Sequence, residues 1–143
     1  MKTCRRGVMM IRYADENDFD ELRKHDTHIE EQELRNSIKA NRILLMLEHD
    51  ILIGWLRYGL FWDNIPFMNM LYFMEEHRGK GNGRQLVDFW ENEMRSKQYK
   101  MVMTSTLSNE QAQFFYRKNG YIDCGSLLLP NEPLEIMMLK KLM

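Results

Sequence analysis

Apolar residues along the chain follow two different spacings, and each spacing predicts a different kind of element. Short apolar runs bounded by turn residues are typical of strands, whereas apolar residues three and four positions apart are typical of a helix with one buried face. The pair Asp18 and Glu21, like Ser108 and Gln111, has the spacing of a capping box and indicates a helix start. We expect strands over residues 8–13, 43–47, 51–61, 67–74, 101–103, 121–129 and 134–139.

Four helices fit between these strands. They are expected from Leu22, around Leu34, around Trp90 and around Phe115, and the last of them should stop at Gly120. The resulting order, β-α-α-β-β-β-α-β-α-β-β, predicts a protein of the α/β (α+β) class with a mixed sheet and helices on its faces. No linker, repeat or low-complexity segment divides the sequence. We therefore expect a single domain over residues 8–143, preceded by a flexible leader over residues 1–7.

Charge and cysteine content narrow the classes of protein that the chain can be. Lys and Arg number 20 against 21 for Asp and Glu, which argues against a protein that mainly grips nucleic acid or an anionic membrane. No apolar run approaches the roughly 18 residues of a membrane span. The two cysteines, Cys4 and Cys124, match no metal-ligand spacing, and we expect neither a disulfide nor a metal site. These features predict a protein of the reducing cytoplasm.

The segment from Arg78 to Gly83 is the first candidate for chemistry. Three glycines in five residues follow a predicted strand and precede a predicted helix, and glycine lets the backbone turn tightly and approach a ligand closely. The first turn of a helix presents unpaired N–H groups and favours an anion. Arg78, Lys80 and Arg84 add three cations, and a guanidinium can hold a phosphate with two parallel hydrogen bonds. The loop therefore predicts a site for a pyrophosphate.

Two well-known phosphate motifs do not fit this loop. A P-loop requires G-x-x-x-x-G-K-[ST], which the residues from Gly79 onward do not supply. A dinucleotide fingerprint requires G-x-G-x-x-G, and the last position counted from Gly79 and Gly81 is Arg84. A glycine-rich turn with solvated basic residues is the alternative that the motif alone leaves open.

Two sequence motifs, which follow one another along the chain, resemble the motifs of one family. Arg78-x-x-Gly81-x-Gly83 matches R/Q-x-x-G-x-G/A, and a second match is Asn109-x-x-Ala112-x-x-Phe115-Tyr116-x-Lys118-x-Gly120-Tyr121. The chain thus resembles the GNAT superfamily of acetyl-CoA-dependent N-acetyltransferases, with the same order of elements from about Val8 to Leu142. The resemblance implies a mostly antiparallel mixed sheet with helices on both faces. It also implies acetyl-CoA as co-substrate and no metal.

The resemblance assigns the cofactor-binding residues by position. Backbone groups of the strand before the loop would pair with the pantetheine arm, and the loop would hold the pyrophosphate through its N–H groups. Asn109 would reach the pantetheine or amide part of the cofactor. The implied cofactor-binding residues are Phe73, Met74, Arg78, Gly79, Lys80, Gly81, Asn82, Gly83, Arg84, Asn109 and Tyr116.

Tyr116 matches the tyrosine that in many members of the family protonates the departing thiolate. That role is chemically reasonable, because the pKa of a thiol is near 8.5 and that of a tyrosine is near 10. The alternative is that Tyr116 is a buried aromatic residue of the core. The general base is not identified, because Asn69 stands where many members carry a carboxylate and an amide cannot act as a base. Surface positions are expected for Glu75, Glu76, His25, His28 and Glu31, and the alternative for the last three is that they face the acceptor site.

The sequence indicates the residues of the acceptor side less clearly than those of the cofactor side. Trp55, Tyr58, Phe61 and Trp62 crowd one strand and its exit, where one face could wall an acceptor pocket and hold an amine cation, while core packing is the alternative. Cys124 is expected to be a small buried residue. The resulting hypothesis is transfer of acetyl from acetyl-CoA to a primary amine of a small molecule, or else of a protein, by a monomer or homodimer. The alternative from another class is a non-catalytic module that binds coenzyme A.

Overall fold

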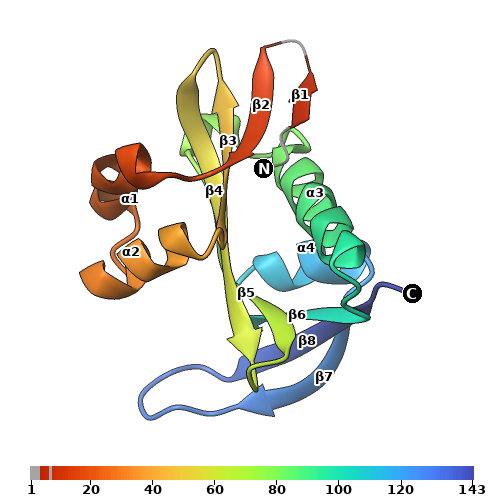
Figure 1. Ribbon diagram of the computed structural model, residues 1–143. Helices are drawn as coiled ribbons and strands as arrows, with labels where there is room; N and C mark the ends of the chain where they lie inside the picture. The colour runs from red at the N-terminus through yellow and green to blue at the C-terminus, as the bar shows by residue number, and fades with distance from the viewer. Residues whose placement is uncertain (1–3, 7) are drawn as a thin grey trace. The chain divides into compact units, whose positions relative to one another are not determined.

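The computed structural model describes residues 4–6 and 8–143, and these fall into two compact units (Figure 1). The N-terminal unit comprises Met1–Gly59 and Met70–Val87, and the C-terminal unit comprises Leu60–Asn69 and Asp88–Met143. The strands are β1 (Cys4–Arg6), β2 (Met9–Tyr13), β3 (Ile43–Glu48), β4 (Ile51–Phe61), β5 (Ile65–Phe73), β6 (Met101–Leu107), β7 (Ile122–Leu127) and β8 (Glu135–Lys141). The helices are α1 (Phe19–His25), α2 (Glu31–Lys39), α3 (Asn82–Ser96) and α4 (Ala112–Lys118), with short 3-10 helices η1 (Glu16–Asp18) and η2 (Glu75–His77).

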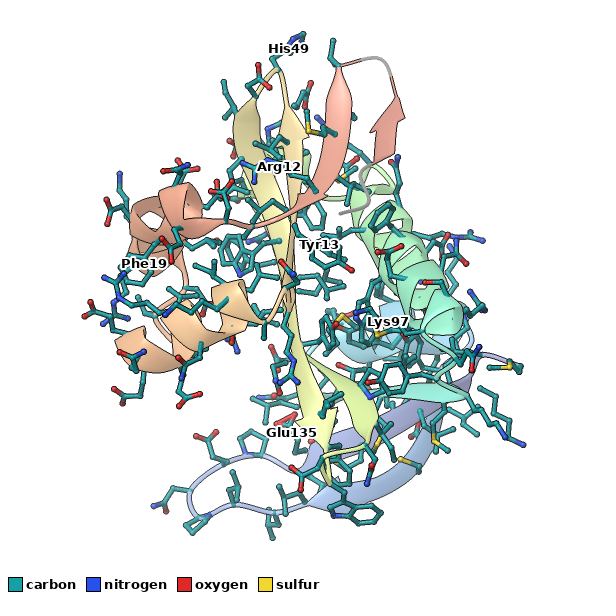
Figure 2. All side chains as sticks on the ribbon, viewed as in Figure 1. Arg12, Tyr13, Phe19, His49, Lys97 and Glu135 are labelled. Carbon is teal, nitrogen blue, oxygen red and sulfur yellow. The ribbon has the colours of Figure 1, made fainter. Side chains whose placement is uncertain are left out.

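The sheet of the N-terminal unit is antiparallel. β2 pairs with β1 on one side and with β3 on the other, and β3 pairs with β4. The β3–β4 turn is His49–Asp50, and both residues have positive φ (51° and 65°), which suits a two-residue hairpin on twisted strands. His49 is labelled at the tip of this hairpin in Figure 2. A register shift between Met46 and Leu47 marks a bulge in the β3–β4 pairing.

Both faces of β3 are buried, as its uninterrupted apolar sequence predicts. Ile43, Leu45 and Leu47 belong to the core cluster that also contains Leu22 of α1 and Leu34 of α2. Since side chains alternate along a strand, the residues between these three point to the opposite face of the sheet. That face is also covered, because the intervening residues Leu44 and Met46 are fully buried.

The C-terminal unit carries a mixed sheet. β5 pairs in parallel with β6 at Phe67 with Met103 and at Met68 with Thr104. β6 pairs with β8 and β8 pairs with β7, both antiparallel, so that the last two strands appear in reverse order. The order through both units is β1-β2-β3-β4-β5-β6-β8-β7. The predicted mixed, mostly antiparallel sheet with helices is therefore confirmed.

Local differences from the prediction have identifiable causes. The predicted capping box of Asp18 with Glu21 is wrong, because the box lies three residues earlier and is formed by Asp15 and Asp18 at the start of η1. Asp18 is held there by two hydrogen bonds from the Arg12 guanidinium of β2, at 2.8 and 2.9 Å (Figure 2 labels Arg12). Likewise α4 has no side-chain cap at Gln111. Neither of the predicted capping boxes therefore forms at the expected pair of residues.

Strand boundaries also moved. β5 begins at Ile65, two residues before the expected strand over 67–74, and the turn before it has positive φ at Trp62 and Asp63. Residues 4–6 pair with β2 as β1, although they were included in the expected leader. Residues 1–3 and 7 lie outside the described part of the chain, and both the flexible leader and the single domain over 8–143 stay predictions. Each helix among the described residues is too short or too polar to cross a membrane.

Candidate functional site

The glycine loop grows out of the end of β5 in the N-terminal unit. Directly after β5, the Met74 N–H donates a hydrogen bond of 2.9 Å to the Ile53 carbonyl of β4. The buried ring of Phe73 lies against Gly54, so closely that a Cβ on Gly54 would overlap it. The start of the loop is thereby fixed to β4 by one hydrogen bond and one close packing contact.

Two side chains close the loop from within. Arg78 Nε donates to the Phe73 carbonyl at 2.8 Å, and Asn82 Nδ2 donates to the His77 carbonyl at 3.1 Å. Each bond spans five residues, and together they tie the end of β5 and the η2 turn to the start of α3. His77 adds a polar contact to Glu48 of β3, with Nδ1 3.4 Å from Oε2. The loop is therefore held in shape before any ligand arrives, which lowers the entropy that binding must overcome.

The backbone between these clamps has the conformation that an anion site needs. Gly79 and Gly81 have φ of 69° and 83°, in the left-handed region that favours glycine, and no atom lies within 4 Å of a Cβ built on either. The Gln85 N–H donates to the Gly81 carbonyl, which makes this the start of the helical hydrogen-bond ladder. The N–H groups that precede the ladder belong to the first turn of α3 and are the donors that helices offer to anions.

Three cations surround this helix start, as the sequence predicts. Arg78, Lys80 and Arg84 are all exposed. The Arg78 guanidinium carbon also lies 5.1 Å from the centre of the Tyr72 ring, where a cation is attracted to the aromatic face. Since Arg78 uses Nε for the Phe73 carbonyl, its outer nitrogens are available to a phosphate in the described structure.

Two of the predicted cofactor residues have other partners in the structure. Asn82 is only 7% exposed and its amide closes the loop, so its contribution is to loop shape. The Met74 N–H already bonds to Ile53, so it would have to leave that partner before pairing with a pantetheine arm. The sequence could not show either partner, because both hydrogen bonds depend on where the loop folds back.

An aromatic row lies in the same unit, and Tyr72 is the member that sequence reasoning did not single out. Trp55 is 4.9 Å from Tyr72 and 6.1 Å from His25, measured between ring centroids. Trp55 itself is buried, which confirms the core alternative for that residue, whereas Tyr72 is 39% exposed beside Arg78. The signal that could have found Tyr72 is its position at the end of β5, six residues before Arg78.

A buried ion pair supports the Trp55 end of this row. Asp26 accepts hydrogen bonds from Arg57 Nε at 2.9 Å and from Trp55 Nε1 at 3.3 Å, and all three side chains are buried. Charges are tolerated in a core only when they are paired and hydrogen-bonded. Asp26 therefore fixes the turn after α1 against β4.

The C-terminal unit positions Tyr116. The Tyr116 ring on α4 makes edge contacts with Phe115 and Tyr121, at 5.4 and 5.6 Å between centroids, and its side chain hydrogen-bonds to that of Thr104 on β6. Thr104 Oγ1 in turn donates to the Met68 carbonyl of β5 at 2.9 Å. Burial raises the pKa of Tyr116 to about 12. The phenol is therefore a protonated hydrogen-bond donor at any physiological pH.

A buried polar cluster lies next to Tyr116 and was missed by sequence reasoning. Tyr121 donates its hydroxyl to Glu91 Oε2 at 2.8 Å, and Lys140 Nζ donates to Glu91 Oε1 at 2.8 Å. Burial, followed by the Glu91 carboxylate, raises the pKa of Tyr121 above its ordinary value. Glu91 shares the helix with the apolar stripe around Trp90, and a carboxylate beside such a stripe is the signal that could have indicated it.

The remaining candidates lie at the surface. Asn69 and Asn109 are exposed, and the exposed positions expected for Glu75, Glu76, His25, His28 and Glu31 are confirmed. The expected burial of Cys124 is wrong, because this residue sits at a register shift in the exposed strand β7. Trp62 is not part of a strand face but of the β4–β5 turn, where it is 76% exposed. No group of three or more metal-ligating side chains occurs in the part of the chain that the structure describes.

Comparison with known proteins identifies the family of the chain. Residues 9–121 match the Acetyltransferase (GNAT) family, so the chain belongs to the GNAT acetyltransferases and is an acyltransferase. No curated protein sequence matches the chain significantly.

Solved structures share the fold at low identity. Ard1 from Thermoplasma volcanium superposes with a TM-score of 0.82 at 13% identity, covering 95% of this chain and 99% of that one. PaiA N-acetyltransferase from Thermoplasma acidophilum, in complex with coenzyme A, gives 0.76 at 18%, covering 93% and 98%. Arabidopsis thaliana Naa50, in complex with the bisubstrate analogue CoA-Ac-MVNAL, gives 0.76 at 17%, covering 93% and 98%.

Proposed function

We propose that the protein transfers the acetyl group of acetyl-CoA to the primary amine of a small molecule, by direct attack in a ternary complex. The observation that carries this proposal is the preshaped loop between β5 and α3. It combines left-handed glycines, open space beside them, the first turn of a helix and exposed cations. Acetyl-CoA offers a pyrophosphate to such a site, and the similar PaiA structure contains coenzyme A.

The pyrophosphate is assigned to the loop backbone and its cations. The N–H groups of Gly79, Gly81, Gly83 and Arg84 would donate to phosphate oxygens at the positive end of the α3 dipole. Arg78 would add its outer nitrogens, and Lys80 would act as a mobile charge. Asn82 would keep the loop closed through His77. Phe73, Met74 and Asn109 stay predicted contacts of the pantetheine arm.

The chemical steps follow from the substrate. A neutral amine attacks the thioester carbonyl, its nitrogen forms a bond to carbon, and the carbonyl oxygen takes the negative charge. When the tetrahedral intermediate collapses, the carbon–sulfur bond breaks and the thiolate leaves, while the positively charged nitrogen loses one proton to solvent or to a base and becomes the amide nitrogen. Tyr116 would donate a hydrogen bond to the departing sulfur. Because the acceptor ammonium has a pKa near 10 in solution, the reaction should accelerate as pH rises from 7.

A calorimetric titration with acetyl-CoA, followed by thiol release over a panel of amines, tests the proposal. We expect acetyl-CoA to bind and a small amine to release thiol faster than peptides with free N-termini. Lys80→Ala should weaken acetyl-CoA binding, whereas Lys97→Ala, which removes the same charge beyond the far end of α3, should not (Lys97 is labelled in Figure 2). Absence of acetyl-CoA binding would refute the loop assignment.

Two other outcomes would change the acceptor part of the proposal. Binding without thiol release from any amine would favour a non-catalytic module that binds coenzyme A. Faster release with peptides would favour a protein amine, as in the complex of Naa50 with a peptide-based bisubstrate analogue.

A further inference from the structure

The hydroxyl of Tyr116 bonds to Thr104, but the position of its ring depends on two aromatic neighbours. Thr104 donates its own Oγ1 to the Met68 carbonyl at 2.9 Å and is thereby fixed in turn. The Tyr116 ring makes edge contacts with Phe115 at 5.4 Å and with Tyr121 at 5.6 Å, measured between centroids. Phe115 is the neighbour of Tyr116 on α4 and moves with it, whereas Tyr121 lies beyond the end of α4. Tyr121 is therefore the ring contact that can fix Tyr116 relative to the rest of the C-terminal unit.

Tyr121 is itself anchored by a carboxylate from a helix that is distant in sequence. The residue is buried, and its hydroxyl donates to Glu91 Oε2 at 2.8 Å. Glu91 lies on α3, 30 residues earlier in the chain. A hydrogen bond to a charged acceptor is roughly twice as strong as one between neutral groups. Glu91 thus holds the ring that contacts Tyr116.

The carboxylate of Glu91 is buried, and Lys140 makes its burial possible. Glu91 is only 1% exposed, and a carboxylate in such a position needs a charge partner and hydrogen bonds. Lys140 Nζ of β8 donates to Glu91 Oε1 at 2.8 Å, so each carboxylate oxygen has its own donor. The Lys140 ammonium also lies 5.7 Å from the centre of the Tyr121 ring. Glu91, Tyr121 and Lys140 are called the Glu91 cluster below.

The Glu91 cluster also contacts the backbone at the end of α4. The Tyr121 N–H donates to the Tyr116 carbonyl at 3.0 Å. Gly120, which precedes Tyr121, has φ of 93°, and a Cβ built on it would lie 3.2 Å from Lys140 Cε. The turn that follows α4 is therefore packed against Lys140. Both the ring and the backbone of Tyr116 are in contact with the cluster.

We propose that Glu91 is a positioning residue that orients Tyr116 through Tyr121, and that Lys140 is its charge partner. This inference rests on the proposed function, in which Tyr116 donates a hydrogen bond to the departing sulfur. Stability alone gives little reason for the cluster, because a buried ion pair is often no more stabilising than apolar residues of similar volume. Orientation gives a stronger reason, since a misplacement of about 1 Å at a reaction centre can lower the rate about 100-fold.

Thiol release at saturating acetyl-CoA and amine tests the hydrogen bond between Tyr121 and Glu91. Tyr121→Phe keeps the ring and removes only the hydroxyl that bonds to Glu91. Its kcat should fall about five- to twentyfold, with KM for acetyl-CoA unchanged. The control is Ser96→Ala, which removes a 2.8 Å hydrogen bond at the last residue of α3, and its kcat should match that of the wild type.

Two substitutions of Glu91 separate the hydrogen bond from the charge. Glu91→Leu offers no acceptor to Tyr121, and its kcat should fall as far as that of Tyr121→Phe. Glu91→Gln keeps an oxygen that can accept from Tyr121, and its kcat should stay within about threefold of the wild type. A loss in Glu91→Gln as large as that in Glu91→Leu would overturn the proposed action through Tyr121.

A double-mutant cycle distinguishes positioning from a general loss of structure. If Tyr121→Phe acts through the Tyr116 hydroxyl, adding it to Tyr116→Phe should lower kcat by less than about twofold, because the group that it positions is already absent. An equal factor in both backgrounds, or an unchanged kcat in Tyr121→Phe beside a loss in Tyr116→Phe, would overturn this inference alone. An unchanged kcat in Tyr116→Phe would instead remove the proposed role of Tyr116, and this inference with it.

Discussion

The hydroxyl of Tyr116 is the group whose removal tests the chemistry most directly. Tyr116→Phe keeps the ring that packs between Phe115 and Tyr121, and it removes only the O–H that bonds to Thr104. Because the side chain is 6% exposed, the remaining ring fills the same space. Any loss of rate therefore reports on the hydroxyl.

The raised pKa sets the size of the expected effect. With Tyr116 at about 12 and a thiol near 8.5, full proton transfer from the phenol to the thiolate is uphill by about 5 kcal/mol. Tyr116 should instead stabilise the leaving thiolate by hydrogen bonding, and a hydrogen bond to a charged group contributes about 1.5–3 kcal/mol. We expect kcat of Tyr116→Phe to fall about 10- to 150-fold, with little change in KM for acetyl-CoA.

The assay is thiol release at saturating acetyl-CoA and amine between pH 7 and 10.5. As the pH rises, the wild-type rate should not fall with an apparent pKa near 10, because Tyr116 stays protonated over this range. Tyr99→Phe, which removes the hydroxyl of a half-buried tyrosine in the same unit, is the control. An unchanged kcat in Tyr116→Phe would remove Tyr116 from the mechanism. A wild-type decline near pH 10 that is absent from Tyr116→Phe would show a true proton donor with an unshifted pKa.

The remaining predictions concern binding and stability. Gly81→Ala should lower the affinity for acetyl-CoA about tenfold, as measured by calorimetry. A φ of 83° costs a residue with a Cβ about 1–2 kcal/mol, and the new Cβ enters the open space of the loop. An unchanged affinity would contradict the loop assignment. Gly54→Ala should lower the free energy of unfolding in urea by about 1–3 kcal/mol, since the new methyl group overlaps Phe73, and an unaltered midpoint would refute that packing. Asp26→Asn should lower the free energy of unfolding by about 3–5 kcal/mol, because it leaves Arg57 buried without a carboxylate partner. A loss below about 1 kcal/mol would show that Arg57 finds another partner.

Features that depend on residues near one another in sequence could be predicted without the structure. The glycines from Gly79 to Gly83 followed by an amphipathic helix predicted a turn with positive φ and a helix start, and the structure has both. In each case the conformation follows from local steric limits and from the period of apolar residues, which neighbours in the chain determine.

Features that depend on distant partners were decided only by tertiary structure. Asn82 turned inward because the folded loop brings the His77 carbonyl to it, and Cys124 became exposed because β7 is the last strand of the sheet order. Alternation along β8 shows that Met137 and Leu139 share a face, but the same pattern would serve a buried face equally well. Which face the helices cover depends on how α4 packs on the sheet. Contact between residues far apart in the chain, and not local preference, therefore decides which of these side chains are buried.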